Sequence, residues 1–127
     1  MKKLFAILIL ALGTTLATAQ NQGNRYMFTG KVINAPTSVP ACGTLEIFMA
    51  IEFEITMFSD ENYSDQTIAI VFHCPDFLGQ DFFKDGATYK FEVFDDYNGN
   101  VSVTNQSVLD GYNLPQTYYA GDIKRID

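Results

Sequence analysis

The chain has 127 residues, of which fifteen are acidic and eight basic, and its formal net charge is −7. Without Lys2 and Lys3, which lie in the leader, six basic residues face the same fifteen acidic ones and the charge becomes −9. An acidic chain without a cluster of Lys and Arg repels a phosphate backbone, so nucleic acid is not an expected partner.

Residues 1–19 have the pattern of a secretory signal peptide. A basic start at Lys2 and Lys3 is followed by an apolar run over 4–12, and small residues end the segment at Ala17 and Ala19. The run is shorter than the ~20 residues of a membrane span. We therefore expect cleavage after Ala19, a secreted or periplasmic location, and a mature chain, 20–127, that forms one domain and does not span the membrane.

Cys42 and Cys74 are the two cysteines of that mature chain. An even number of cysteines in an oxidising compartment favours a disulfide between them. Two buried thiols that never meet are the alternative, because the sequence does not fix their geometry.

A first strand is expected over 25–34, where Gly30 indicates a bulge or bend, and a loop follows over 35–43. Residues 45–58 then alternate strictly. At ~3.3 Å per residue this strand would run to about 45 Å, against ~17–20 Å for most strands, so it must coil around a core as barrel strands do. Its apolar, inward-facing positions are the odd ones: Leu45, Ile47, Met49, Ile51, Phe53, Ile55 and Met57.

The even face of this strand is mixed, with Phe48 and Ala50 beside Glu52 and Glu54. Part of it must therefore be covered by the chain's own loops or tail, or by a partner. Paired carboxylates at Glu52 and Glu54 could also suggest glycosidase chemistry, but such pairs are common on the solvated face of a strand.

The polar segment 59–66 predicts a hairpin connection to a strand over 67–74, which is apolar on both faces and therefore central. One or two helical turns are expected over 76–84, with Asp76 as N-cap. A further strand covers 87–95. Asn98-Gly99 predicts a type I′ hairpin to a strand over 100–104, and an irregular segment follows over 106–116. The last segment, 117–126, is a strand from Tyr118 or, alternatively, a short helix.

This pattern resembles the oligonucleotide/oligosaccharide-binding fold, the OB-fold, a small barrel that hosts many unrelated functions. The resemblance implies a five- to six-stranded all-β barrel with one short helical turn, and ligands on the second and third strands and the adjoining loops. An immunoglobulin-like or transthyretin-like sandwich is the alternative. The segments that carry the resemblance are 28–32, 52–55, 68–72, 82–91 and 119–126.

Two kinds of OB-fold protein fit the residues poorly. Inhibitors of the tissue-inhibitor type chelate a protease metal with an N-terminal cysteine, whereas Gln20 is the expected first residue here. Secreted OB nucleases need arginines beside carboxylates, and the only arginines, Arg25 and Arg125, lie at opposite ends of the mature chain.

His73, Cys74 and Asp76 form the one place where His, Cys and a carboxylate crowd together. Adjacent strand residues point to opposite faces, so we expect His73 to be unable to activate Cys74. One His and two Cys are also too few for a typical zinc site.

Residues 95–100 have the oxygen density of a calcium loop, with Asp96, Asn98 and Asn100 at alternate positions. However, Val101 and Ser107 stand where an EF-hand needs Gly and Glu, and the hairpin explains the loop without a metal. We expect no metal and no other cofactor.

Three tyrosines near the end, Tyr112, Tyr118 and Tyr119, lie among amide side chains and suit sugar or protein recognition. Alternatively, Tyr119 closes the core and the others cover it. Three Asn-x-Ser matches, at Asn62, Asn100 and Asn105, are treated as chance because the leader looks bacterial. The candidate ligand-binding residues are Phe48, Glu52, Glu54, Tyr112 and Tyr118.

The absence of a catalytic constellation favours a secreted or periplasmic binding or interaction module for an unknown protein or glycan. The first alternative is a small enzyme or metal-dependent protein that uses His73, Asp76 or 95–100. The second is a component of an assembly or scaffold.

Overall fold

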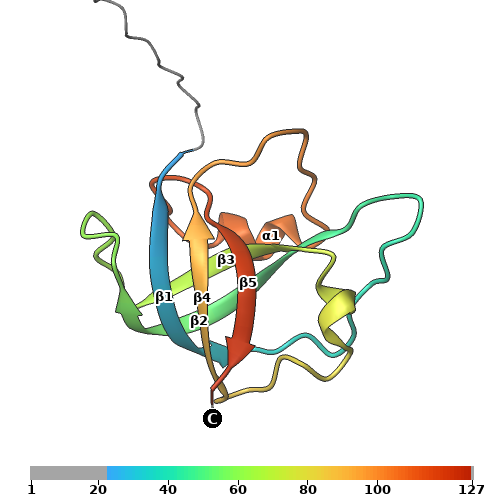
Figure 1. The fold of residues 1–127 in the computed structure, drawn as a ribbon, viewed down its shortest axis with the longest axis horizontal. Helices are drawn as coiled ribbons and strands as arrows, with labels where there is room; N and C mark the ends of the chain where they lie inside the picture. Colours follow the sequence, from blue (N-terminus) through green and yellow to red (C-terminus); the bar gives the residue numbers. More distant parts are fainter. Residues whose placement is uncertain (1–22, 127) are drawn as a thin grey trace, which may run out of the picture.

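A computed structural model describes residues 23–126, which form a five-stranded β-barrel closed in the order β1-β2-β3-β5-β4 (Figure 1). All neighbouring strands are antiparallel except β3 and β5, which pair in parallel at Val71 and Tyr119. The expected all-β barrel is confirmed, and it is compatible with an OB-like fold. The expected signal peptide lies outside the described residues. The elements are β1 (Arg25–Ile33), β2 (Phe48–Phe58), β3 (Thr67–His73), η2 (Pro75–Leu78), β4 (Thr88–Phe94), α1 (Gln106–Asp110) and β5 (Tyr119–Arg125).

Aromatic rings fill the inside of the barrel because alternate positions of each strand point inward. Phe28 packs against Phe53 and Phe91 with ring centroids 5.3 and 5.0 Å apart, and Phe72 lies 5.3 Å from Phe91. Burial of each such side chain stabilises the fold by about 1.5–3 kcal/mol.

The expected bulge at Gly30 is confirmed, and it lies where β1 meets β2. Thr29 pairs with Met57 and Gly30 pairs with Ile55, so Thr56 is the extra residue on β2. A Cβ on Gly30 would lie 2.8 Å from the carbonyl oxygen of Glu54, which leaves no room for a larger residue. The bulge bends β2 around the core.

The expectation that all odd positions of 45–58 form the inner wall is wrong at both ends. Leu45 is 74% exposed, because the strand begins only at Phe48. Past the bulge the alternation inverts, so Phe58 packs on the core while Met57 is 42% exposed. Of the seven odd positions, only Met49, Ile51 and Phe53 are buried in the barrel core.

The outer face of β2 and β3 is covered by the chain's own segment 97–112, which includes α1, as we expected for the half-apolar face. Phe48, Ala50 and Val71 form a second buried cluster with Val103 and Leu109 of that segment. Asn105 fixes the cover, because its amide accepts from the Ala50 N–H at 2.8 Å and donates to the Ala50 carbonyl at 2.9 Å.

The predicted hairpin at Asn98-Gly99 and strand over 100–104 are wrong. A type I′ turn needs positive φ at both central residues, but of the two only Gly99 has one, at 133°. The physical reason lies in the barrel: β1 and β5 occupy both edges of β4, so a returning strand finds no free edge. The segment crosses to β2 instead, where Val103 makes a single bridge with Phe48.

The disulfide between Cys42 and Cys74 is confirmed, with an S–S distance of 2.10 Å and Cα atoms 5.5 Å apart. It ties the loop before β2 to the end of β3. The expected N-cap role of Asp76 is wrong, because Cys74 occupies the N-cap position of η2 and Pro75 begins the helix. Cys74 has a φ of 48°, a left-handed conformation that ends β3 abruptly.

Candidate functional site

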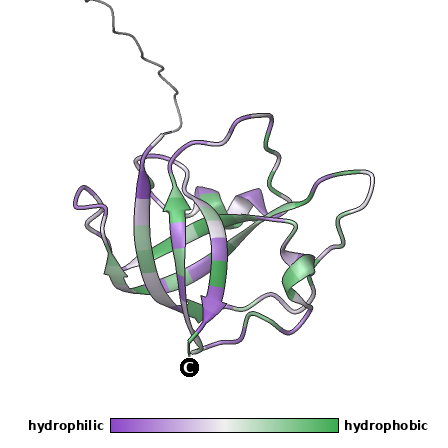
Figure 2. Cartoon of the chain, viewed as in Figure 1, coloured by the Kyte–Doolittle hydropathy of each residue, from purple (hydrophilic) through white to green (hydrophobic). Residues whose placement is uncertain are grey.

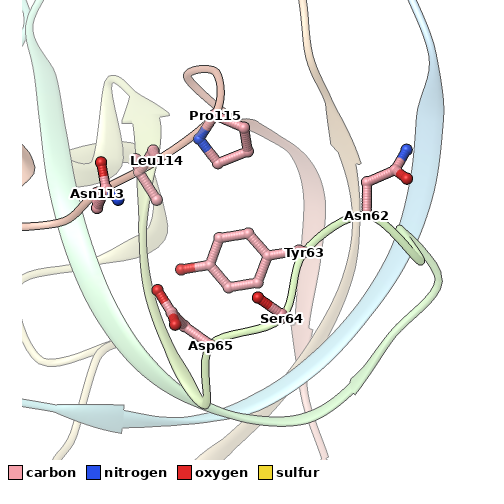
Figure 3. A pocket seen from close by; sticks show the side chains of 7 residues that line it. All are labelled: Asn62, Tyr63, Ser64, Asp65, Asn113, Leu114 and Pro115. Atoms are coloured by element: carbon pink, nitrogen blue, oxygen red, sulfur yellow. The ribbon is translucent and has the colours of Figure 1, made fainter.

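A polar groove runs between the loop that joins β2 to β3 and the loop that follows α1. It consists of two hollows of about 300 and 640 Å³ that share Asp65 and Asn113. The ring of Tyr63 lies across the smaller one, between Leu114 and Pro115 on one side and Asp65 on the other (Figure 3). We call this the hairpin groove. Its lining residues are Glu52, Asn62, Tyr63, Ser64, Asp65, Thr67, Ser107, Val108, Gly111, Tyr112, Asn113, Leu114 and Pro115.

Buried polar contacts hold the first of these loops in place. Asp60 is buried and accepts from the Tyr118 hydroxyl at 2.6 Å and from the Asn62 N–H at 3.0 Å. Tyr63 donates its hydroxyl to the Thr67 carbonyl at 2.6 Å. The loop is therefore tied to Tyr118, just before β5, and to β3, and Asn62, Ser64 and Asp65 project from it into solvent.

Glu52 and Tyr112 join the floor of the groove to the loop after α1. The Tyr112 hydroxyl donates to the Glu52 carboxylate at 2.7 Å, and Asn34 donates to the other oxygen at 3.4 Å. Burial, together with this bond to a carboxylate, raises the pKa of Tyr112 above its ordinary value. Burial and the nearby Asp65 raise the pKa of Tyr63 to about 12. Both hydroxyls thus stay protonated donors at neutral pH.

The groove is lined by acidic and amide side chains and by no basic ones. Carboxylates at Glu52 and Asp65 accept, amides at Asn62 and Asn113 both donate and accept, and the lining residues named above include no Lys, Arg or His. Its rim is hydrophilic where the 59–66 loop projects (Figure 2). Such a surface suits a ligand rich in hydroxyl or amino donors and disfavours an anionic one.

The five candidate ligand-binding residues are scattered by the fold. Glu52 and Tyr112 line the hairpin groove, and Glu54 is exposed next to it on β2. Phe48 and Tyr118 are buried and present almost no surface to a ligand. Tyr118, at 0% exposure, takes the core position that we expected Tyr119 to fill. Tyr119 packs instead on Tyr97, with ring centroids 5.4 Å apart.

Of the groove residues, only Glu52 and Tyr112 were among the ligand-binding candidates, so the sequence-based selection missed the others, including Ser64, Asp65 and Asn113. Ser64 and Asp65 looked like an ordinary polar hairpin connection, and Asn113 like part of an irregular tail. The one available signal was a tyrosine, Tyr63, within an otherwise polar turn. That signal does not show that the turn faces a loop about fifty residues further along the chain.

The expectation that His73 and Cys74 face apart is wrong. The His73 Nε2 lies 3.5 Å from the Cys74 Sγ, because the left-handed backbone at Cys74 breaks the alternation of the strand. Cys74 is nevertheless no free nucleophile, since its sulfur is bonded to Cys42.

Metal-ligating side chains gather at one place within residues 23–126, namely Cys42, Cys74 and Asp76. The two sulfurs are joined in the disulfide, so they are not available as thiolate ligands.

The candidate calcium loop has a structural role at its first residue. The Asp95 carboxylate accepts from the Asn24 N–H at 2.8 Å and from the Tyr26 hydroxyl at 3.3 Å. Burial opposes ionisation, but these bonds prevail and lower the pKa of Asp95. Tyr97 in the same loop packs on Phe48, with ring centroids 5.3 Å apart. Asp95 thus pins the start of β1 to the end of β4.

No protein-family model, curated protein or solved structure matches this chain. None of the helices within residues 23–126 has the length and apolar character needed to cross a membrane. A function must therefore be argued from the hairpin groove itself.

Proposed function

We propose that this chain is a non-catalytic binding module that takes a glycan without acidic groups in the hairpin groove. The observation that carries the proposal is the convergence of two loops, far apart in the sequence, on one polar hollow crossed by the ring of Tyr63. Sugars present rings with one apolar face and many hydroxyl donors. A tyrosine ring beside carboxylates and amides matches both features.

The groove is also held ready for a ligand. Tyr63 and Tyr112 are each fixed by a hydrogen bond, to the Thr67 carbonyl and to Glu52 respectively. A ligand would therefore order few side chains on binding, which lowers the entropic cost. The acidic groups, Glu52 and Asp65, favour neutral or amino sugars over sulfated or uronic ones.

We also propose that the protein works outside the cytoplasm, as a secreted or periplasmic chain released by cleavage after Ala19. The disulfide supports this location, because such bonds persist in oxidising compartments. N-terminal sequencing of the protein recovered from the medium or periplasm of its native cell tests the cleavage site. A chain that still begins at Met1 would contradict it.

A glycan array probed with the fluorescently labelled chain tests the binding proposal. We expect binding to neutral or amino glycans, with Kd in the micromolar to millimolar range. Asp65→Ala and Asn113→Ala should each weaken binding about tenfold, since each removes hydrogen bonds worth ~1 kcal/mol or more. Asp81→Ala is the matched control, because Asp81 is also an exposed acidic residue but does not line the groove.

Three results would contradict the proposal. The first is an array without any bound glycan. The second is binding confined to acidic glycans. The third is binding that Asp81→Ala weakens as much as Asp65→Ala, because that result would point to overall charge rather than to the groove. Capture of a protein partner that survives both groove substitutions would favour a protein-interaction module instead.

A further inference from the structure

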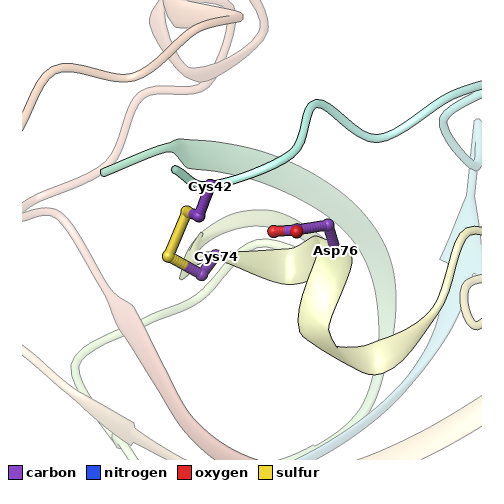
Figure 4. A group of neighbouring side chains, drawn as sticks. All are labelled: Cys42, Cys74 and Asp76. Carbon is purple, nitrogen blue, oxygen red and sulfur yellow. A yellow bond between two sulfur atoms is a disulfide. The ribbon is translucent and has the colours of Figure 1, made fainter. Parts of the chain in front are cut away.

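The Cys42–Cys74 disulfide lies at the opposite end of β2 and β3 from the hairpin groove, and its two sulfurs have unequal surroundings. Cys42 is half-buried in a loop whose other residues from 40 to 46 are exposed. Cys74 is buried directly after β3 (Figure 4). An incoming nucleophile therefore reaches the sulfur of Cys42 more easily than that of Cys74.

A proton donor stands beside the buried sulfur. The His73 Nε2 lies 3.5 Å from the Cys74 Sγ and 2.8 Å from a carboxylate oxygen of Glu46. Because Nε2 faces a carboxylate, we assign a proton to it. When a thiolate forms at Cys74, this N–H can turn from Glu46 to the sulfur 3.5 Å away and stabilise it.

Asp76 is half-buried, and the surroundings of one of its carboxylate oxygens differ between the oxidised and the reduced form. The carboxylate lies within 4.8 Å of both sulfurs and points toward the disulfide (Figure 4). Its Oδ1 is buried and accepts no hydrogen bond from the described residues. A buried acceptor without a donor is costly, and a thiol formed at Cys74 would bring an S–H within reach. Reduction can thus satisfy a group that the disulfide leaves unpaired.

A pocket adjoins the same sulfur. It has a volume of about 320 Å³ and opens where β3 and β5 diverge after their single pairing at Val71 and Tyr119. Phe77 on η2 lies at its rim and is 77% exposed, and η2 is largely hydrophobic (Figure 2). Cys42 does not line this pocket, so the pocket can hold only the apolar flank of a thiol-bearing molecule, whose sulfur reaches Cys42 from the side of its loop.

We propose that the Cys42–Cys74 disulfide undergoes thiol–disulfide exchange in the native protein. The thiolate of an external thiol attacks the Cys42 sulfur, a new bond forms between these two sulfurs, and the bond to Cys74 breaks. The electron pair leaves on the Cys74 sulfur as a thiolate beside His73. A second external thiol then releases Cys42, so two thiols are oxidised to one disulfide and the protein gains two thiols.

The thiol can come from a small molecule or from a cysteine in a peptide, and the test has an arm for each. Reduced glutathione and a cysteine-bearing peptide with apolar flanks are each added in excess to the oxidised chain. The rate of exchange is measured without denaturant and in urea that unfolds the chain. If the peptide reacts faster than glutathione in the native state only, the natural thiol belongs to a peptide, and its apolar flanks bind in the pocket. Equal or faster reaction of glutathione assigns it to small thiols.

We expect the native disulfide to react at least as fast as the unfolded one, and mass spectrometry to find the first mixed disulfide on Cys42. His73→Gln should slow the native reaction about tenfold and leave the rate in urea unchanged, because it removes the imidazole beside the sulfur that leaves. Arg25→Gln is the control, since it breaks the 3.1 Å ion pair with Glu92, which involves neither of the cysteines.

A structural disulfide would behave differently. Reduction would then be slower in the native state than in urea by orders of magnitude and would follow the unfolding rate, and that result overturns the proposal. A mixed disulfide found first on Cys74 also overturns it. The position of the mixed disulfide in the unsubstituted chain decides the matter even if His73→Gln fails to fold. Neither measurement involves a glycan. A negative result would therefore overturn the exchange proposal and leave the proposed glycan binding untouched.

Discussion

The two ends of the β2–β3 pair are built from the same two strands but are closed by different chemistry. At one end a covalent bond joins Cys42 to Cys74, and a histidine and a carboxylate flank it. At the other, the buried hydrogen bond between Tyr118 and Asp60 holds a polar hairpin loop. The difference teaches that the disulfide end is fixed by one covalent bond, whereas the hairpin end depends on a buried pair of polar side chains, Tyr118 and Asp60.

The largest effect should come from removal of the covalent closure. Cys42→Ala with Cys74→Ala should lower the free energy of unfolding by about 3–4 kcal/mol, because the sequence separation of 32 frees a long loop in the unfolded chain. Urea unfolding followed by circular dichroism measures it. A loss below ~1 kcal/mol would show that the loop before β2 is held without the bond.

Removal of the hydrogen bond between Tyr118 and Asp60 should lower the free energy of unfolding by less than removal of the disulfide. Tyr118→Phe should lower the free energy of unfolding by about 2–3 kcal/mol, because it leaves an oxygen of buried Asp60 without a donor. Tyr112→Phe is the matched control, since it removes a bond to the less buried Glu52 and should cost about 1 kcal/mol. Equal losses for the two variants would contradict the distinction between fold and groove.

The loss of stability should be smaller again when the contact between the 97–112 segment and β2 is weakened. Asn105→Ala removes both hydrogen bonds to the backbone of Ala50 and should cost about 1–2 kcal/mol. Loosening of the 97–112 segment would expose Phe48 and Val71, so amide hydrogen exchange in that segment should accelerate before the rest of the barrel opens. Unchanged exchange there would mean that apolar packing alone holds the cover.

High pH should destabilise the end of the β2–β3 pair that Tyr118 and Asp60 close. The pKa of Tyr118 is raised by burial and by Asp60, and that of Tyr63 is raised to about 12. The folded chain therefore holds these protons more tightly than the unfolded chain, whose tyrosines titrate near ~10. The stability is intact below pH ~10 and is lost as the pH rises above it. Tyr118→Phe should flatten this decline in urea unfolding measured from pH 9 to 12.

The smallest effect on stability should come from the groove itself. Asn113→Ala should change the free energy of unfolding by no more than about 0.5 kcal/mol, because Asn113 is exposed. The same substitution should weaken glycan binding about tenfold. A large loss of stability would mean that Asn113 serves the fold, and its effect on binding could then no longer be assigned to the groove.

Local patterns in the sequence predicted the barrel. The alternation around Ile51 and Phe53 in β2 marks the inner wall, and Gly30 in β1 marks the bulge, because each signal is local to its own strand. The return strand after Asn98-Gly99 was predicted wrongly because that pair is a local signal, whereas the edges of β4 are occupied by strands far away in the chain.

The sites were harder to predict for the same reason. The proximity of His73 to the Cys74 sulfur depends on one residue in a left-handed conformation, for which the sequence has no glycine as a warning. The hairpin groove depends on two loops that meet only after the barrel closes. Glu52 and Tyr112 could be selected as separate polar candidates, but their 2.7 Å contact could not.

The most direct test of the hairpin groove is a nuclear magnetic resonance titration of the ¹⁵N-labelled chain with cellobiose and with chitobiose. We predict saturable shifts of the backbone amides of 62–67 and 111–114, with those of 72–78 at the disulfide end unchanged. Asn113→Ala should weaken the response, and Asp81→Ala should not. Saturable shifts centred on 72–78, or no shifts with either disaccharide, would contradict the account.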